Sequence, residues 1–551
     1  MLKKQKIAFF SAALLTIVLL VGTARPDLYF LIKKNFTIFS EVYREVAINY
    51  VDDVEPEKLM RKGIDSMLES LDPYTVFIDE ADKQNIDIVT QGSYGGIGVT
   101  VGVRGDKLVV ISPTEGYSAH KQGIRAGDVI ISIDGIVVEN LTPDEVQNLT
   151  TGEPGTTVML TINRLGLDQD LTFELQRERI EVKNIDYSGF IDEEKTIGYI
   201  SLSRFSQNAA ADMQQAFEKL QAQNELKGLV IDLRNNPGGL LSEAVGIVDI
   251  FIDAGQKVVE IRGRMEAQNR VFKSSSQALA PSLPVTVLQN NGSASASEIV
   301  AGAMQDLDRA VIMGSQSFGK GLVQIVQPLS YNTALKLTTA RYYIPSGRSI
   351  QSVTYRHDDK NAAVEKPDSL RRAYQTQNGR TVYDGEGITP DMLVGVTKPG
   401  MLETALLQQN RIFTFANRYV SENDSYTYDA LPGNVFEDFK SFLEQNNFKY
   451  KTSAEETLQK VITELEKQDI PSSQTSSHVI GLQKAIDREK AKNFINHAGE
   501  IKKMLHLELM SRYGGETARR AASLKVDPLL RQAVQVLKNS DRYNSILSGP
   551  G

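Results

Sequence analysis

Apolar and polar residues follow three patterns along the chain. Residues 27–90 carry apolar side chains at every third or fourth position, which predicts two amphipathic helices separated near Pro56. Residues 91–180 change to short apolar runs between glycine turns, a pattern typical of short strands. From about residue 401 the helical spacing returns, with a flexible break predicted at residues 469–478. This C-terminal region, residues 401–551, contains no chemical motif and is interpreted as a scaffold or partner-binding module.

The longest regular pattern lies between residues 187 and 345, where short apolar runs alternate with helical segments. The predicted strands cover residues 196–202, 228–233, 258–262, 284–288, 310–313, 322–326 and 335–343. Strands alternating with helices predict a mostly parallel, layered α/β core, here assigned to residues 181–400. Sheets of this kind place their sites at the carboxyl ends of their strands. Three turns lie at or near such ends, at residues 235–239, 290–295 and 315–321.

The second of these turns joins a predicted strand to a predicted helix. It carries three serines, Ser293, Ser295 and Ser297, and the helical spacing begins at Glu298. Backbone N–H groups at a helix start are unpaired and carry the positive end of the helix dipole. A hydroxyl in that place has anion-stabilising amides beside it, as acyl transfer requires. Serine is equally typical of a simple helix cap, so this stretch alone leaves both interpretations open.

The amino-acid composition limits which catalytic groups the chain can use. The chain has no cysteine, which excludes disulfides, a cysteine nucleophile and thiolate metal sites. Its five histidines leave none between residues 121 and 356, and no metal-binding cluster is seen, so neither a metal nor another cofactor is expected. The net charge of −8, without a basic cluster, makes nucleic acid an unexpected partner. A serine nucleophile in the core would therefore need a carboxylate or a lysine as its base.

Lys320 is the candidate base. It lies between two glycines and is followed by an apolar strand, so its backbone can enter a crowded cleft. Burial there would favour the neutral amine, the form that a general base requires. Gln324 comes four residues later, where its side chain could orient the amine without adding charge. On residue types alone, a solvated loop lysine is the simpler interpretation.

The N-terminus indicates export. Lys3, Lys4 and Lys6 precede an apolar run over residues 7–21, which is shorter than the ~20 residues that a membrane-spanning helix needs. Residues 1–26 are therefore predicted to be a signal peptide, or an uncleaved anchor in the inner membrane. Either alternative places the rest of the chain in the cell envelope, in a periplasmic or extracytoplasmic compartment.

Two sets of motifs resemble a known family. Gly95-Gly96-Ile97-Gly98 and the segment from Ser118 to Ile130 resemble a circularly permuted PDZ domain, here residues 91–180. Asp232-Leu-Arg-Asn-Asn-Pro-Gly-Gly239, the serine-rich turn and Ser-Phe-Gly-Lys320-Gly resemble the carboxyl-terminal processing peptidases (tail-specific proteases). The resemblance covers about residues 37–400. It implies a crotonase-like layered α/β protease core with an inserted PDZ domain, flanked by the N-terminal helical region, residues 27–90, and the C-terminal one.

The resemblance also implies roles for residues. Ser295, which lies 25 residues before Lys320, would be the nucleophile of a Ser/Lys dyad, with Gln324 assisting the lysine. The oxyanion hole would consist of backbone amides of Ala296 and of Gly238 or Gly239. The PDZ loop, Gly95, Gly96, Ile97 and Gly98, would bind the C-terminal tail of a polypeptide substrate. A homodimer or an adaptor protein would be a further partner.

Two other functions fit part of the sequence. One is a catalytically silent PDZ scaffold that captures peptide tails in the envelope. The other is an acyl-thioester enzyme of the crotonase type, whose layered core the family's fold is said to resemble. Export and the PDZ motif argue against the second, because acyl-CoA is cytosolic.

Overall fold

The computed structural model describes residues 28–79, 92–355, 363–395, 399–423, 426, 431–467 and 472–549. The predicted signal peptide or anchor, residues 1–26, lies outside the described residues. Over the part that is described, no helix combines the length and the apolarity needed to cross a membrane. The chain forms two compact units, Met1–Phe77 with Tyr355–Ala362, and Ile78–Thr354 with Ala363–Gly551.

The described part of the first unit contains the two predicted helices, α2 (Leu28–Asn49) and α3 (Pro56–Glu69). Proline is tolerated in the first turn of α3 because the N–H that it lacks has no partner there. The Tyr43 hydroxyl donates to the Pro56 carbonyl at 3.0 Å and so fixes the start of α3 against α2.

In the second unit, residues 92–181 form a small β domain. Its sheet has the order β3-β4-β5-β7-β8, and β6 pairs with β5. The strands are β3 (Val99–Arg104), β4 (Lys107–Pro113), β5 (Val129–Ile133), β6 (Ile136–Val137), β7 (Thr157–Asn163) and β8 (Leu171–Gln176). Helices α5 (Ser118–Lys121) and α6 (Pro143–Thr150) accompany the sheet, and β2 (Ser93–Gly96) pairs with β9 (Glu178–Glu181). Alternate residues of β7, among them Val158, Leu160 and Ile162, point into one core.

The central sheet of the second unit has the order β10-β11-β12-β15-β16-β23. Its strands are β10 (Ile185–Phe190), β11 (Ile197–Leu202), β12 (Gly228–Asp232), β15 (Val285–Gln289), β16 (Val311–Gly314) and β23 (Met392–Leu393). β10 is antiparallel to β11, and all other neighbours are parallel. The predicted mostly parallel core is therefore confirmed for this sheet.

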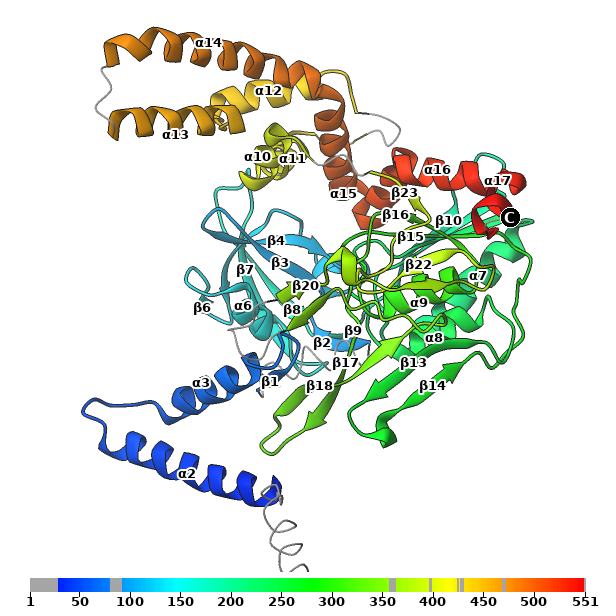
Figure 1. Ribbon diagram of the computed structural model, residues 1–551. Coiled ribbons are helices and arrows are strands. Elements are labelled where there is room, and N and C mark those ends of the chain that lie inside the picture. Colours follow the sequence, from blue (N-terminus) through cyan, green and yellow to red (C-terminus); the bar gives the residue numbers. More distant parts are fainter. Residues whose placement is uncertain are drawn as a thin grey trace, which may run out of the picture. The chain divides into compact units, whose positions relative to one another are not determined.

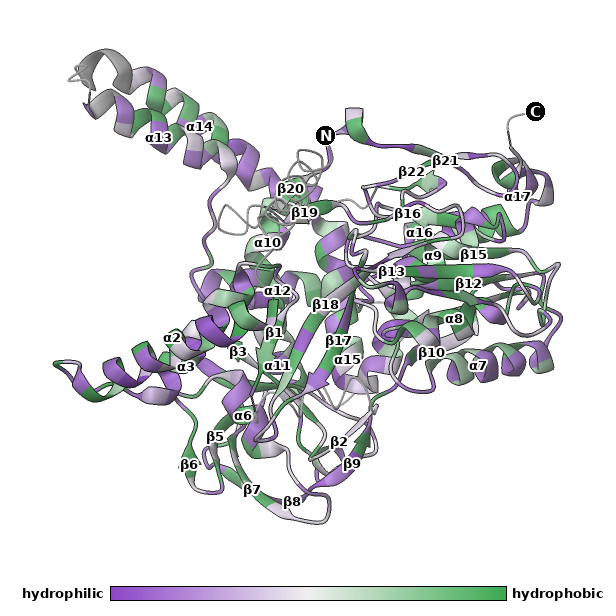
Figure 2. Cartoon of the chain, turned by 60° about the horizontal axis from the view of Figure 1, so that its bottom comes forward, coloured by the Kyte–Doolittle hydropathy of each residue, from purple (hydrophilic) through white to green (hydrophobic). Residues whose placement is uncertain are grey.

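Helices cover both faces of this sheet (Figure 1). α7 (Ala209–Gln223), α8 (Leu241–Asp249) and α9 (Ala296–Asp306) pack on one face. α16 (Pro528–Leu537) and α17 (Ser540–Leu547) pack on the other. Because both faces are covered, β11, β12, β15 and β16 are buried along their whole length, and β12 and β15 are mainly hydrophobic in Figure 2.

One part of the predicted core belongs elsewhere. The strands predicted at residues 258–262, 322–326 and 335–343 do not join the parallel sheet. They form a separate antiparallel sheet as β13 (Lys257–Gly263), β17 (Leu322–Pro328) and β18 (Ala334–Tyr343), together with β14 (Arg270–Lys273). Short strands β1 (Val76–Ile78), β19 (Val353–Tyr355), β20 (Ala363–Glu365), β21 (Ala373–Gln375) and β22 (Thr381–Tyr383) complete the β structure of the described residues.

The remaining α-helices of the described residues lie between residues 401 and 525. They are α10 (Met401–Gln408), α11 (Arg411–Glu422), α12 (Val435–Gln445), α13 (Ser453–Lys467), α14 (Ser472–Asn496) and α15 (Ala498–Lys525). The flexible break predicted at residues 469–478 is wrong from Ser472 onward, because that segment is the first part of α14. Further along the same helix, Lys490 of α14 pairs with Glu455 of α13 at 2.9 Å.

Candidate active site

Three loops meet at the carboxyl ends of β12, β15 and β16. We call them the glycine turn (residues 234–239), the serine junction (residues 290–298) and the lysine loop (residues 315–321). Asn290 Oδ1 accepts the Asn235 amide at 2.9 Å, which joins the serine junction to the glycine turn. The Phe318 amide donates to the Ser293 carbonyl at 3.0 Å, which joins the serine junction to the lysine loop. The structure therefore brings together the three turns singled out in the sequence.

Ser295 has an unusual backbone conformation. Its φ of 57° and ψ of −112° place it outside the regions that residues with a side chain normally adopt. It sits immediately before α9, and its side chain is half-buried rather than enclosed. Strain of this kind costs of order 1–3 kcal/mol and persists only where the surrounding structure enforces it. A serine on a strained strand-to-helix turn resembles the nucleophile elbow of other hydrolases, in which the turn exposes Oγ.

The other two serines have structural contacts. Ser293 and Ser297 are buried, and their hydroxyls donate to the carbonyls of Leu233, at 2.8 Å, and Asn236, at 2.9 Å. Both carbonyls belong to the segment at the end of β12. Ser293 and Ser297 thus attach the serine junction to the glycine turn, and this contrast distinguishes Ser295 from its neighbours.

Glu298 is buried between the serine junction and the lysine loop. Its Oε2 accepts the amides of Ser295 and Lys320, both at 2.8 Å. Its Oε1 accepts the Ser317 hydroxyl and the Gly319 amide, both at 2.6 Å. One carboxylate oxygen therefore fixes the backbones of the two residues predicted to form the dyad. Burial raises the pKa of Glu298, although the four donors act against that shift.

Lys320 is half-buried in the lysine loop. Its carbonyl accepts the hydroxyl of Tyr342 from β18, so the backbone of Lys320 is held through both its amide and its carbonyl. Gln324 lies in β17, where its side-chain amide donates to Thr338 Oγ1 at 3.2 Å. The antiparallel sheet thus supplies the support for Lys320 and the position of Gln324.

The glycine turn approaches the serine junction too closely for side chains. Gly238 has a φ of 97°, and a Cβ there would lie 2.7 Å from the Ala294 carbonyl and 2.9 Å from the Ala296 amide nitrogen. The Gly238 amide donates to Asn236 Oδ1 at 2.9 Å. Gly239 has a φ of 150°, and a Cβ there would lie 2.3 Å from the Phe205 carbonyl. Only glycine fits these positions, which places the turn directly beside Ser295 and the start of α9.

A buried carboxylate also stands behind the glycine turn. Asp232, at the end of β12, accepts the Tyr199 hydroxyl at 2.7 Å and the guanidinium of Arg234 at 2.6 Å. Burial opposes its ionisation, but Arg234 and the hydrogen bonds prevail, so the pKa of Asp232 is lowered. Sequence reasoning had assigned no role to Glu298 or Asp232. The spacing Ser295-x-x-Glu298, which is that of a capping box, was the available signal for Glu298.

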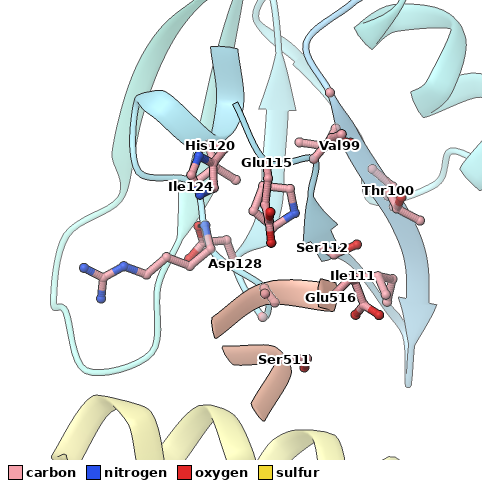
Figure 3. Close-up of a pocket in the computed structure, with 18 of the residues that line it drawn as sticks. Val99, Thr100, Ile111, Ser112, Glu115, His120, Ile124, Asp128, Ser511 and Glu516 are labelled. Carbon is pink, nitrogen blue, oxygen red and sulfur yellow. The ribbon is translucent and has the colours of Figure 1, made fainter. Parts of the chain in front are cut away.

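A separate cavity of about 1410 Å³ lies on the β domain (Figure 3). β3 is the edge strand of its sheet, and residues of β3 and α6 line the cavity, among them Val99, Val101 and Gln147. Of the predicted PDZ loop, Ile97 and Gly98 line it, while Gly95 and Gly96 lie in β2, paired with β9. Ser511 and Glu516 of α15 contribute to the same cavity in Figure 3.

Comparison with known proteins gives the family. Residues 196–358 match Peptidase family S41, residues 85–163 match the PDZ domain, and residues 402–537 match the C-terminal helical domain of probable PDZ-proteases. A carboxy-terminal-processing protease of Bartonella bacilliformis is 40% identical over 337 residues, which cover 61% of this chain and 76% of that protein. The chain belongs to the carboxy-terminal-processing proteases of family S41. It is a serine-type peptidase with a PDZ domain.

Two other relatives are less similar in sequence to this member of the family. A probable CtpA-like serine protease of Staphylococcus aureus is 33% identical over 317 residues, covering 57% of this chain and 62% of that protein. The solved structure of a photosystem II D1 C-terminal processing protease has 28% identity and a TM-score of 0.36, and covers 68% of this chain and 96% of its own. The described residues of this S41 member contain no group of three or more histidine, aspartate or glutamate side chains that could hold a metal ion.

Proposed function

We propose that this protease cleaves exported proteins near their C-termini, with Ser295 as nucleophile and Lys320 as general base. The observation that carries the proposal is the shared carboxylate oxygen of Glu298. It accepts the amides of both residues and thereby fixes the distance between their backbones. Holding reacting groups in place in this way removes much of the entropic cost of the reaction.

In the proposed reaction, the neutral amine of Lys320 takes the proton of the Ser295 hydroxyl as Oγ attacks the peptide carbonyl carbon. The C–N bond then breaks, the proton passes to the leaving amine, and an acyl-enzyme remains on Ser295. Water, deprotonated by Lys320, attacks the ester, and Ser295 recovers its proton. Gln324 assists Lys320 by orienting the amine.

Backbone amides stabilise the oxyanion in this proposal. The Ala296 amide lies at the start of α9, where the helix dipole favours negative charge. The glycine turn supplies the second donor, from Gly238 or Gly239. The Gly238 amide is donated to Asn236 in this structure, so its use would require the turn to release that bond, whereas Gly239 is exposed. Loss of one oxyanion donor typically costs on the order of 100- to 1000-fold in rate.

The substrate tail binds, in this proposal, as an added strand on β3. This edge strand leaves backbone groups to pair, and α6 lies beside it, so an extended peptide fits between them. Backbone amides near Ile97 and Gly98 receive the terminal carboxylate. Envelope localisation, through the N-terminal signal or anchor, and a homodimer or adaptor as partner are parts of the same proposal that rest on the sequence.

The test uses the purified full-length chain and a protein substrate that ends in an unstructured, apolar tail. Ser295→Ala is expected to abolish cleavage, as followed by mass spectrometry of the products, while Ser545→Ala at an exposed position of α17 leaves it unchanged. A substrate with an amidated C-terminus should bind more weakly than the free acid. Undiminished cleavage by the Ser295 variant would overturn the assignment. Tail binding without cleavage by the unmodified chain would favour the silent-scaffold alternative.

A further inference from the structure

The residue that caps the N-terminus of α16 reaches the glycine turn. Asp527 is the N-cap of α16 and accepts the amides of Leu529, at 2.9 Å, and Leu530, at 3.2 Å. Its second oxygen, Oδ2, pairs with the guanidinium of Arg234 at 2.7 Å. The same side chain thus caps a helix near the C-terminus and binds the first residue of the glycine turn.

Arg234 stands between two carboxylates. It makes a two-pronged contact with Asp232, whose side chain is 1% exposed, and its outer nitrogen also binds Asp527, which is 15% exposed. Hydrogen bonds between charged groups are stronger than neutral ones, especially where water is largely excluded. The guanidinium is therefore fixed from the β12 side by Asp232 and from the α16 side by Asp527.

The position of Arg234 determines where the glycine turn begins. Its amide donates to Asp232 Oδ1 at 3.0 Å, and the next two residues bind the serine junction. Asn235 bonds with Asn290, and the Asn236 carbonyl accepts the Ala294 amide and the Ser297 hydroxyl. A displacement of Arg234 would accordingly reach the residues on either side of Ser295.

α16 packs directly against the central sheet and is part of the protease core. Leu529, Leu530, Ala533, Val536 and Leu537 are all buried in a cluster with residues of β11, β12, β15 and β16. The Cα of Asp527 is therefore held by packing, and its carboxylate has a fixed origin from which to bind Arg234.

We propose that Asp527 is a positioning residue for catalysis: through Arg234, it holds the glycine turn in the geometry that the oxyanion donor requires. The C-terminal helical region thereby contributes to the reaction itself. This inference rests on the proposed function, because it presumes that the glycine turn takes part in peptide cleavage.

The test compares Asp527→Asn with Lys538→Gln in the full-length chain. Asparagine caps a helix about as well as aspartate, so the variant removes the negative charge that faces Arg234 and keeps the start of α16. Lys538 follows the other end of α16 and binds Asp192, at 3.0 Å, and Glu194, at 2.9 Å, away from the turn. We expect Asp527→Asn to lower kcat about 10-fold with KM nearly unchanged, and Lys538→Gln to leave kcat within twofold.

Two further measurements keep the outcome decisive. Asp527→Glu, which restores the charge, should recover part of kcat. In an Arg234→Lys background, which loses the forked contact, Asp527→Asn should have a smaller effect than in the unmodified chain, and this non-additivity is independent of any loss of thermal stability. Equal kcat losses for the Asp527 and Lys538 variants, or none for Asp527→Asn, would overturn the inference. If Ser295→Ala stays active, the proposed function fails instead.

Discussion

Glu298 and Asp232 are both buried carboxylates at strand-to-helix junctions beside Ser295, yet they are held in different ways. Glu298 receives four donors, three backbone amides and one hydroxyl, all uncharged. Asp232 receives a guanidinium and a tyrosine hydroxyl. The serine junction is thus organised around a carboxyl group that accepts hydrogen bonds from uncharged donors, and the glycine turn around an ion pair.

The difference appears in the proton affinities. Burial raises the pKa of Glu298 above its usual range, because neutral donors only partly replace water around the charge. Burial acts in the same direction on Asp232, but the adjacent guanidinium outweighs it and the pKa is lowered. The ionised form is therefore disfavoured at Glu298, which binds the proposed nucleophile and base, and favoured at Asp232.

Glu298→Gln should have the largest effect on this comparison. An amide keeps one acceptor oxygen, so two of the four donors would lose their partner and face an NH₂ group. At about 1.5–3 kcal/mol for each hydrogen bond to a charged group, kcat should fall about 100- to 1000-fold or more. Steady-state kinetics with the tailed substrate measures the loss.

Glu403→Gln is the matched control for this variant. Glu403 is also buried, at 3% exposed, but it binds His497 among the C-terminal helices. Its substitution should leave kcat unchanged whatever it does to thermal stability. Similar kcat values for the Glu298 and Glu403 variants would show that the shared carboxylate oxygen has no part in catalysis.

The sequence predicted much of this site, but not its supports. The alternation of strands and helices placed the serine-rich turn and the glycine turn at strand ends. The pairing of Ser295 with Lys320 came from the resemblance to a family. The antiparallel sheet of β13, β17 and β18 was not foreseen, because an apolar run shows that a strand is buried and does not name its neighbour.

Contacts between distant residues were equally hidden. The position of Asp527 next to Arg234 depends on how α16 packs across the central sheet. The helical spacing that begins at Glu298 does not reveal that every residue of α9 is buried. These supports arise from tertiary packing, which local patterns do not encode.

The pH dependence of kcat and of stability should distinguish Glu298 from Asp232. The expected change in kcat is smaller than that for Glu298→Gln. Because the folded pKa of Glu298 is raised, its contribution to stability is present below the unfolded value of ~4.3 and is lost as pH rises through the folded pKa. Acidification through that folded pKa therefore protonates Glu298 without unfolding the chain on its account. A protonated carboxyl accepts fewer of the four donors, so kcat should fall about 10-fold per pH unit below that folded pKa, at a pH above ~4.3.

Asp232 behaves in the opposite sense. Its folded pKa is lowered, so its contribution to stability is present above the unfolded value of ~3.9 and is lost as pH falls through the folded pKa. Circular dichroism should accordingly show folded protein over the range in which kcat declines, with unfolding only at lower pH. The acid limb assigned to Glu298 should be missing from Glu298→Gln, and its persistence there would assign that limb to another group.

The smallest expected effect concerns the side-chain hydrogen bond between the serine junction and the glycine turn. Asn290 Nδ2 donates to Asn235 Oδ1 at 2.9 Å, and Asn235 is exposed with a φ of 58°. Asn290→Asp removes the donor and retains the Oδ1 acceptor. Asn235→Gly removes the acceptor, and glycine tolerates the positive φ. Each variant should lower kcat only about two- to tenfold, since a net hydrogen bond contributes about 0.5–1.5 kcal/mol.

The double variant tests whether the serine junction and the glycine turn are coupled through this hydrogen bond. If the two junctions are coupled through this bond, Asn235→Gly and Asn290→Asp together should cost little more than either alone, because both break the same contact. Fully additive losses would mean that each junction is held by its own carboxylate. In that case, Ser293 and Ser297, whose hydroxyls also cross to the β12 side, would remain as the links that keep the glycine turn against Ser295.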